Sequence, residues 1–553
     1  VRSRGLGDVY KRQILKKYNE TQEEDSEKIR LLQPIDTFNG YEVTFGWIKN
    51  QDANFETPNA DSNWKVSGNN TILTSNNEVE FEWNNTTGQK FVTTIGLDED
   101  YLFDITQRVE NNSGEEIVIN NASKVTRKQA PTLSGMFILH EGLLGVLQEK
   151  LELIDYDDLK DDDETLNFES DNGWVGITDK YWLAALIPDQ DKSFKAIYTY
   201  DNGYIAYYRS LNATKVMPGS DHIVESQIFI GAKEAKLIDR YQEEYGIYNF
   251  DLAIDWGWFY FLTKPLFNVI YFFSQLSGNF GLAIIISTVI TRVVFFPLAN
   301  WSFISMAKMK MLQPEMTRIK ELHKDDKAQQ QQALMALYKK EKVNPISGCL
   351  PILIQIPFFF AIYKMLFVSI EMRHAPFYGW IQDLAAKDPT TIFNLFGLIP
   401  WDPPSFMIIG IWPVLMGLTM YIQQKLNPAP PDPVQARIFM FFPLFITILL
   451  AQFAAGLVIY WTTNNVLSII QQWIINKRTT RFKFSESDFN FKNLETNTTT
   501  YIKTQEVGTD ELIKCFMRLE DIQFFDLDTE NIILTNCVRK NLSTVIGVFH
   551  KLE

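Results

Sequence analysis

A single charged residue interrupts the most apolar stretch of the chain. Residues 281–301 are long enough to cross a bilayer as one helix, and Arg292 lies near their middle. A guanidinium at that depth costs about 2.5–3.5 kcal/mol on insertion scales, so it should face protein or water. Thr288, one turn before, and Phe296, one turn after, should share its face. A snorkelling arginine is the alternative, but Arg292 lies far from either interface, which favours a functional charge.

The distribution of charge divides the 553 residues into two parts. The net charge of −15 comes mostly from residues before 255, whereas the apolar mass lies between 256 and 475. This contrast predicts a soluble domain joined to a membrane domain. The cysteines, Cys349, Cys515 and Cys537, form neither a disulfide framework nor a zinc motif, and we expect no metal site.

The first part alternates between apolar and polar residues, which is typical of half-buried strands. Clusters of Asn, Asp and Gly separate the strands and predict turns. We therefore expect an antiparallel β-sandwich over residues 14–252, ending in a helix at 233–248. Its carboxylates are scattered rather than paired, so we do not expect an enzyme. The predicted strands include residues 41–47, 79–83, 90–95, 101–106, 194–200 and 227–231.

The next stretch, residues 253–278, is dense in aromatic residues and is interrupted by Lys264-Pro265. Aromatic density of this kind is typical of the membrane–water interface. Its length would also permit a span, but we favour an amphipathic helix lying in the membrane surface.

Five predicted spans then make the chain an α+β multidomain membrane protein with a five-helix transmembrane bundle. The segment 304–349 has nine Lys or Arg residues against five acids, and 476–483 has four bases and no acid. In contrast, 371–405 has four acids against two bases. The positive-inside rule then places 304–349, 426–437 and the tail in the cytoplasm, and the β domain and 371–405 outside. The spans are 281–303, 350–370, 406–425, 438–453 and 456–475.

The segment 304–349 predicts a cytoplasmic helical hairpin. Apolar residues recur at heptad-like spacing on both sides of the turn-like Lys324–Asp326. Its methionines suit contact with varied apolar partners. A plain solvated connector is the alternative. The apolar positions are Met306, Met309, Met316, Ile319 and Leu322 before the turn, and Leu334, Leu337 and Tyr338 after it.

Polar residues and span length add two further expectations. Residues 438–453 would make a helix of about 24 Å, shorter than the roughly 30 Å of hydrocarbon, and local thinning would relieve that mismatch. Gln355 shares a face with Phe359, whereas Lys364 lies on the opposite face near the outer end, where we expect it to snorkel.

With these features in view, residues 279–478 resemble the YidC-type membrane protein insertases of the YidC/Oxa/Alb family. The β domain is similar, in position and strand content, to the periplasmic domain of the Gram-negative members. The resemblance rests on six runs: Ser305-Met-Ala-Lys-Met-Lys-Met-Leu-Gln-Pro314, Met335-Ala-Leu-Tyr-Lys-Lys-Glu-Lys-Val-Asn-Pro345, Gly348-Cys-Leu-Pro351, Leu353-Ile-Gln-Ile-Pro357, Arg373-His-Ala-Pro-Phe377 and Gly456-Leu-Val-Ile-Tyr-Trp-Thr-Thr-Asn-Asn465.

The resemblance implies an insertase of the bacterial inner membrane, with its β domain in the periplasm and without cofactors or turnover chemistry. Client helices would enter through a hydrophilic groove. The implied partners are nascent membrane proteins, the Sec translocon, the ribosome and the lipid bilayer, with no specific readout of nucleic acid. The implied site residues are Arg292, Thr288, Gln355 and Trp461 in the groove; Phe359, Met416 and Leu449 in a hydrophobic slide; and Met306, Met309, Met316 and Leu334 in the client-receiving hairpin.

Three features depart from the family pattern. We expect the sequence to begin after the family's N-terminal anchor helix, as a truncated N-terminus would, and residues 1–13 to be a non-native leader. Lys364 stands where the family usually has an aromatic residue. The basic tail from 479 continues into residues 484–553, which have no counterpart and are expected to be chimeric and dispensable.

Two other functions remain open. A transporter or channel would also place an arginine in a groove, but the five spans contain no Asp or Glu for a relay and no visible inverted repeat. A carbohydrate-binding role of the β domain lacks a readable motif of paired carboxylates.

Overall fold

The computed structural model contains two compact units. The first comprises Val1–Val269 and Phe360–Ala386, and the second Ile270–Phe359 and Lys387–Glu553. The three cysteines and most of the expected leader at 1–13 lie outside the described residues. The described residues are 3–4, 13–23, 25–50, 52–59, 61–68, 70–132, 139–161, 165–341, 343–344, 350–401, 403–404, 407–427, 433–486, 489–492, 499–504, 531–533 and 546–550.

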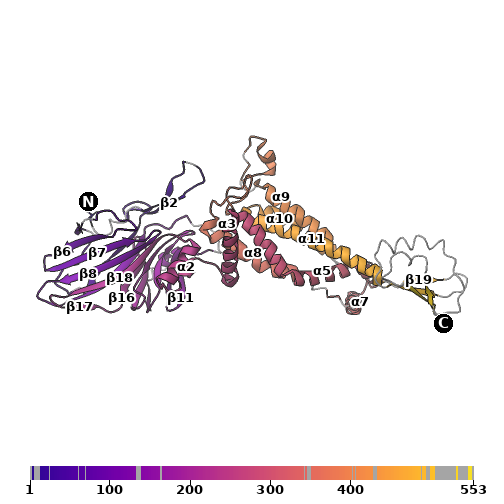
Figure 1. The fold of residues 1–553 in the computed structure, drawn as a ribbon, viewed down its shortest axis with the longest axis horizontal. Coiled ribbons are helices and arrows are strands. Elements are labelled where there is room, and N and C mark those ends of the chain that lie inside the picture. Colours follow the sequence, from indigo (N-terminus) through magenta and orange to yellow (C-terminus); the bar gives the residue numbers. More distant parts are fainter. Residues whose placement is uncertain are drawn as a thin grey trace. The chain divides into compact units, whose positions relative to one another are not determined.

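Two antiparallel β-sheets form the body of the first unit (Figure 1). The ten-stranded sheet has the order β1-β5-β6-β7-β8-β18-β14-β13-β10-β11. The six-stranded sheet has the order β12-β15-β16-β9-β17, with β4 also paired to β9, and β2 and β3 form a separate hairpin. The strands are β1 Ser3–Arg4, β2 Gln13–Asn19, β3 Lys28–Leu32, β4 Tyr41–Lys49, β5 Asn63–Ser67, β6 Val79–Asn84, β7 Gln89–Leu97, β8 Leu102–Asn111, β9 Ile117–Arg127, β10 Gly142–Leu147, β11 Lys150–Asp155, β12 Leu166–Ser170, β13 Trp174–Thr178, β14 Trp182–Ile187, β15 Phe194–Tyr200, β16 Tyr204–Ser210, β17 Thr214–Val216 and β18 Asp221–Ala232.

The alternating pattern of the sequence explains this architecture. In β15, every second residue from Phe194 through Ala196 to Tyr198 is buried, so one face of the strand belongs to the core. One apolar cluster joins side chains of both sheets, such as Ile105 of β8 and Ala206 of β16. All six predicted strands are present, and the prediction of an antiparallel β-sandwich is confirmed.

Short helices complete the first unit: α1 Tyr156–Asp161, α2 Ala235–Glu244, the 3-10 helix η2 Phe250–Ala253 and the 3-10 helix η4 Ile370–Met372. The returning segment 360–386 is tied to the rest of this unit by polar contacts. The Arg373 guanidinium donates to the carbonyl oxygens of Asn19 at 2.7 Å and of Glu20 at 2.9 Å. The Glu371 carboxylate accepts from the N–H of Ala235 at 2.7 Å, in the first turn of α2.

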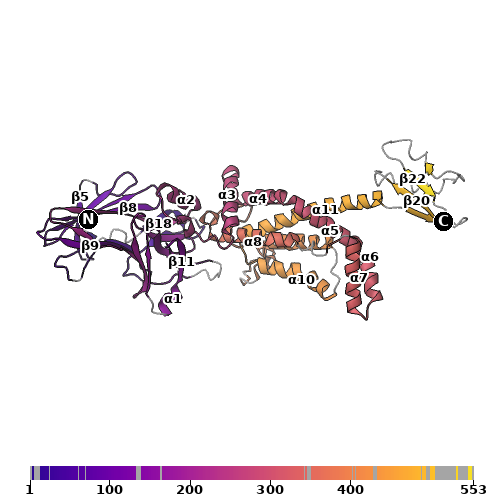
Figure 2. The ribbon, with the colours of Figure 1, turned by 90° about the horizontal axis from the view of Figure 1, so that it is seen from below.

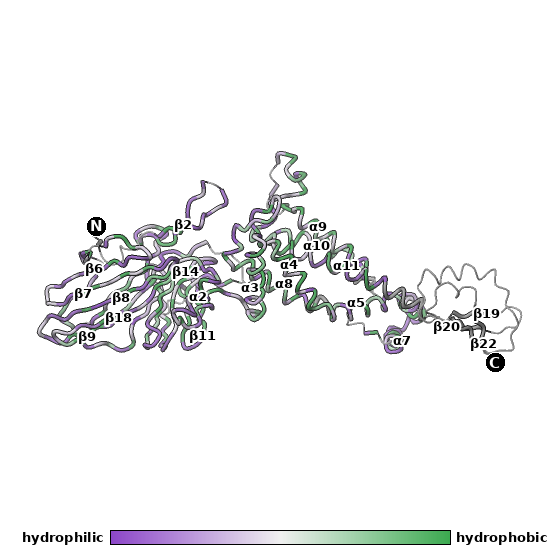
Figure 3. The backbone as a smooth tube through the Cα atoms, in the orientation of Figure 1, coloured by the Kyte–Doolittle hydropathy of each residue, from purple (hydrophilic) through white to green (hydrophobic). Residues whose placement is uncertain are grey.

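Helices dominate the second unit, and Figure 3 colours most of them as hydrophobic. Helices α9 and α10 pack closely at Gly417 of α9. A side chain larger than glycine's would clash there with Thr447 of α10. Two further helices, α3 Tyr260–Ser277 and α8 Leu350–Val368, contribute residues to both units. The other helices are α4 Phe280–Val294, α5 Phe296–Met311, α6 Gln313–Leu322, α7 Lys327–Lys340, α9 Ile411–Leu426, α10 Pro433–Leu450 and α11 Ala455–Glu486, with the 3-10 helix η5 Ile392–Gly397.

The prediction of one helix over 281–303 is wrong. The chain forms α4 and α5, which meet at Phe295 with a bend of 69°. Pro297 explains the break, because a proline lacks the N–H for the helical ladder and its ring clashes with the carbonyl four residues earlier. Pro314 accounts in the same way for a second break at Leu312, so the first half of the expected hairpin is divided between α5 and α6.

Three other predicted spans differ from the structure at their ends. Helix α9 begins at Ile411 rather than 406, after the N-cap residue Gly410. Helix α10 covers 433–450 rather than 438–453, so it begins five residues earlier and ends three residues earlier than expected. Helix α11 continues past 475 to Glu486.

Among the described residues, no single helix combines the length and the apolar character of a bilayer span, whereas the bent pair α4 and α5 does so together. The described part of the tail forms a four-stranded sheet in the order β19-β20-β22-β21. These strands are β19 Phe489–Lys492, β20 Thr499–Thr504, β21 Asn531–Ile533 and β22 Ile546–His550.

Candidate functional site

Arg292 lies in the last turn of α4 and binds across to α11. Its Nε donates to Oδ1 of Asn464 at 2.6 Å, and its Nη2 donates to Oγ of Ser468 at 2.6 Å and to the Asn464 carbonyl at 3.3 Å. The partial negative charge at the C-terminal end of α4 also favours a cation at this position. Both partners are buried, so α11 holds the guanidinium in a defined place.

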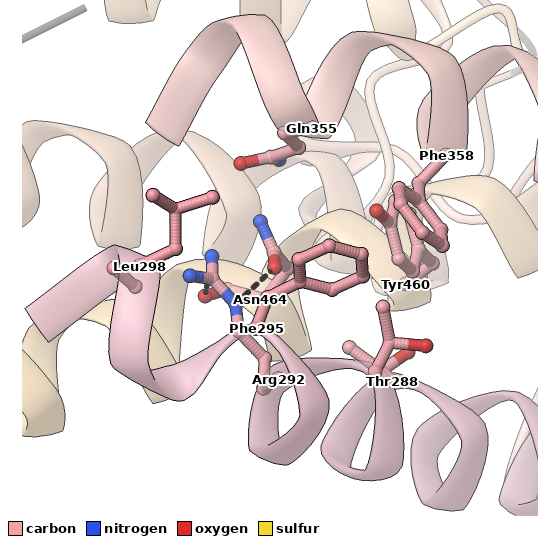
Figure 4. Close-up of a pocket in the computed structure, with 10 residues that line it drawn as sticks. Thr288, Arg292, Phe295, Leu298, Gln355, Phe358, Tyr460 and Asn464 are labelled. Carbon is pink, nitrogen blue, oxygen red and sulfur yellow. Dashed lines mark hydrogen bonds between the residues drawn. The ribbon is translucent and has the colours of Figure 1, made fainter. Parts of the chain in front are cut away.

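A cavity of about 50 Å³, measured as the space open to the centres of water molecules, adjoins this guanidinium. On that measure one water needs roughly 10–15 Å³, so several would fit. Figure 4 shows Gln355 of α8 on the far side of the cavity from α4, with Thr288 beside Tyr460. The lining residues are Thr288, Thr291, Arg292, Phe295, Leu298, Ala299, Gln355, Phe358, Tyr460 and Asn464.

The partners of Arg292 are neutral. Among the described residues, no carboxylate forms an ion pair with its guanidinium, and the hydrogen bonds go to an amide, a hydroxyl and a carbonyl. The Thr288 hydroxyl donates back to the Ile284 carbonyl at 2.7 Å, which leaves its oxygen able to accept from the cavity. The cavity therefore borders a held positive charge that no described side chain neutralises.

The structure brings together Arg292, Thr288 and Gln355, but not Trp461. Trp461 contacts Phe359 edge to face, with ring centroids 4.9 Å apart. Phe296, expected on the face of Arg292, follows the bend and is 50% exposed. Sequence periodicity missed Asn464 and Ser468, although both lie on one helical face of α11 four residues apart.

The expected slide residues fall in two environments. Phe359 and Met416 belong to one apolar cluster, which also contains Trp461 and the buried Leu450. Leu449, in contrast, is 47% exposed and is not part of that cluster. The core of the helices therefore holds Met416, whereas Leu449 presents its side chain outward.

The expected hairpin residues lie on three helices. Met306 of α5 is buried in a cluster with Ala299, Phe303 and Ile475, and Met309 is partly buried. Helices α6 and α7 lie side by side in Figure 2. Buried Met316 of α6 receives the Tyr338 hydroxyl of α7 at 3.9 Å from its sulfur, and Leu334 of α7 is partly buried.

The expectation that Lys364 snorkels to solvent is wrong. Its side chain is 10% exposed, and its Nζ donates to Oδ2 of Asp255 at 2.7 Å. Asp255 Oδ1 accepts from the N–H of Gly257 at 3.0 Å. The partner is 109 residues away in sequence, so no local pattern could identify it.

The stretch expected in the membrane surface forms α3 from Tyr260. Large apolar side chains of this stretch are exposed, and Trp258, just before the helix, is 96% exposed. The others are Tyr260, Phe261, Val269, Phe272 and Leu276.

Comparison with known proteins identifies relatives along most of the chain. The family model described as 60Kd inner membrane protein matches residues 272–482, and the one described as YidC periplasmic domain matches residues 7–269. A membrane protein insertase YidC of Pelagibacter ubique is 53% identical over 455 residues, 82% of this chain and 81% of that protein. One from Methylorubrum extorquens is 48% identical over 479 residues, 84% of this chain and 77% of that protein.

A solved structure of an active YidC insertase, with its first transmembrane domain resolved, aligns with 80% of this chain and 85% of that chain. Its sequence identity is 19% and the TM-score is 0.35. The two family models and the relatives at about half identity cover both the β-sandwich and the helices. The chain therefore belongs to the YidC family of membrane protein insertases.

Proposed function

We propose that this protein inserts the transmembrane helices of client proteins into the bacterial inner membrane, and that the Arg292 cavity receives the polar part of the client. The proposal rests mainly on the Arg292 guanidinium, which lies beside a cavity large enough for water and forms its hydrogen bonds to neutral groups. Family membership supports the insertase function and the inner-membrane location. The match to the periplasmic-domain model supports a periplasmic β domain.

A client's short outer tail must cross the membrane with its polar groups, which hydrocarbon solvates poorly. Water in the cavity and the oxygens of Thr288 and Gln355 would replace part of the lost hydration. An acidic group at 4 Å from Arg292 would gain about 4 kcal/mol at an effective dielectric constant near 20. The client helix would then leave sideways, because its apolar surface prefers lipid.

The neighbouring elements take supporting roles in this proposal. Residues 14–252 form the periplasmic domain, and the exposed aromatic face of α3, within 253–278, lies in the membrane surface. Residues 279–478 form the membrane core, in which α4 with α5, α8, α9, α10 and α11 provide the five spans. The paired α6 and α7 form the cytoplasmic hairpin that meets clients from the ribosome, alone or beside the Sec translocon.

The slide is proposed to guide the apolar part of the client. Leu449 is an exposed apolar residue of α10, and Phe359 and Trp461 belong to the apolar cluster around Met416. The apolar cluster would contact the apolar helix of a client, and the Arg292 cavity would contact its polar tail.

The proposal is tested by replacing Arg292 and measuring insertion of paired clients into vesicles. One client has an acidic outer tail, and in its partner the acids are changed to Asn or Gln. Arg292→Lys keeps the charge but loses the planar fork, so a partial loss is expected. Arg292→Ala should lower insertion of the acidic client about tenfold or more, since a charge-assisted hydrogen bond contributes about 1.5–3 kcal/mol. Arg292→Glu should be worst.

A matched control is Arg437→Ala, which removes an exposed arginine of α10. All variants are compared at equal expression. If Arg292→Ala and Arg292→Glu insert both clients as well as the parent does, the charge is structural and the proposed role of the cavity is wrong.

A further inference from the structure

An uncharged loop before α9 exposes a concentration of large apolar side chains. We propose that this loop, residues 391–401, inserts into the membrane–water interface beside the first turn of α9 and anchors the helical unit to the lipid surface. In Figure 1 it stands away from the helices near the α9 label. Leu398 is 83% exposed, and no charged residue occurs between Pro389 and Trp401. The exposed residues are Ile392, Phe393, Leu395, Phe396, Leu398, Ile399 and Trp401.

Hydrogen bonds tie the base of this loop to α9. The buried Asp388 carboxylate accepts from the N–H of Trp412 at 3.0 Å and from the Thr390 hydroxyl at 2.7 Å. The Thr390 oxygen in turn accepts from the N–H of Ile411 at 3.0 Å. The first turn of α9 therefore holds the loop by hydrogen bonds, and the apolar side chains project from a fixed support.

The tip adopts a costly backbone conformation that keeps apolar side chains outside. Leu395 and Phe396 have φ values of 49° and 59°, in the left-handed region that side chains other than glycine rarely adopt. Their side chains remain 53% and 49% exposed. Strain at such positions persists only where the surrounding structure holds it, and such positions cluster at functional sites. Transfer of the exposed apolar side chains into lipid would offset the cost of this conformation.

Most backbone N–H groups of the loop have partners within the loop or its flanks. Phe396 donates to the Thr391 carbonyl at 2.9 Å, and Ile399 donates to the Asn394 carbonyl at 3.0 Å. The Asn394 side chain accepts from Gly397 at 3.0 Å and donates to the Trp401 carbonyl at 3.4 Å. Hydrocarbon offers no hydrogen-bond partners, so irregular backbone can lie near it only if its N–H and C=O groups are hydrogen-bonded within the protein.

The same features favour lipid over a protein partner. Protein interfaces carry about one hydrogen bond per 100–200 Å² of buried area. The polar side chain within the exposed tip, Asn394, already forms its hydrogen bonds within the loop, so the tip offers few polar contacts to a protein partner. The loop is also continuous with outward apolar residues of α9, including Leu415 and Leu418. A tryptophan at the end of such a segment is typical of the membrane interface.

The test uses the full chain in vesicles of phosphatidylethanolamine and phosphatidylglycerol. Cys349, Cys515 and Cys537 are changed to Ser, and a bimane fluorophore is attached at Leu398→Cys. The matched control is Ile72→Cys, an apolar residue of the β domain that is 70% exposed. Quenching is measured with lipids that carry a nitroxide on a shallow acyl carbon, and separately with aqueous iodide. Phe396→Cys repeats the measurement at a neighbouring position.

The label in the loop should lose most of its fluorescence to the nitroxide lipid and little to iodide, with the reverse at Ile72. Adding Leu395→Asp should restore access of iodide at Leu398. Equal iodide quenching at the two positions would overturn the proposal, because the loop would then lie in water. Shielding from both quenchers would also overturn it and would indicate a protein partner or a second copy. The readout is independent of insertion activity and therefore of the function proposed above.

Discussion

The largely buried ion pair between Lys364 and Asp255 predicts a strong non-additive effect on stability. Lys364→Met keeps most of the volume of the side chain but removes its charge. The Asp255 carboxylate then loses a charged partner at 2.7 Å and keeps the N–H groups of Gly257 at 3.0 Å and His140 at 3.4 Å. Asp255→Asn leaves the lysine charge buried instead, and the double variant removes both charges.

The magnitude follows from the burial of the two side chains, which are 10% and 28% exposed. Breaking a buried pair by removing one partner costs about 3–5 kcal/mol. Because Asp255 retains some contact with solvent and two backbone donors, we expect about 3 kcal/mol for Lys364→Met. The double variant should return to within about 1 kcal/mol of the parent, since replacing both charges is often close to neutral.

Thermal unfolding of the β domain, followed by intrinsic fluorescence of the full chain in detergent, measures this cycle. A loss of 3 kcal/mol corresponds to about 6–12 °C in Tm for a domain of this size. Lys150→Met, an exposed lysine of β11, serves as the control and should leave Tm within error. The reasoning fails if Lys364→Met leaves Tm unchanged, or if the two single effects simply add in the double variant.

Three further predictions concern other parts of the chain. Burial raises the pKa of Glu371 from its ordinary 4.5 to about 7, and one of its oxygens has no partner among the described residues, so deprotonation opposes folding. The free energy of unfolding should therefore fall by up to about 3 kcal/mol as pH rises from roughly 4.5 through 7. Glu371→Gln should remove that slope in urea titrations, and a slope that persists in this variant would contradict the assignment to Glu371. Pro297→Leu should let α4 and α5 straighten, lengthening EPR distances between labels at their outer ends and lowering client insertion; unchanged distances would mean that packing, not proline, causes the bend. A photo-crosslinker at exposed Leu449 should capture a stalled client more strongly than one at fully buried Met416, and equal yields would contradict the outward placement of Leu449.

The β-sandwich could be predicted in detail because strand facing is a local property. Alternation over a few residues decides which side chains enter the core, and β15 has the predicted bounds, 194–200. Which strands pair is less accessible: β18 lies between β8 and β14, and its neighbours come from distant parts of the sequence.

The helical unit was harder to predict because the mean hydropathy of an apolar run does not show where a helix breaks within it. The run 281–303 is continuously apolar, yet Pro297 divides it at Phe295. Arg292, Thr288 and Gln355 line one cavity, and their assignment to a client-binding groove stays a prediction. The expectation for Lys364 was wrong because its partner, Asp255, depends on tertiary packing. The ring contact of Trp461 with Phe359 also depends on tertiary packing, and its role in the groove stays a prediction.

The return of residues 360–386 to the first unit also sets an order of events during synthesis. Arg373 binds the Asn19 carbonyl across 354 residues of sequence. At about 5–20 residues per second, the ribosome needs roughly 20–70 s to make that interval. Until then the β2–β3 hairpin lacks this contact, and long loops of this kind close slowly. The N-terminal unit therefore becomes complete only after α8 has been made, which couples maturation of the β domain to synthesis of the first part of the helical unit.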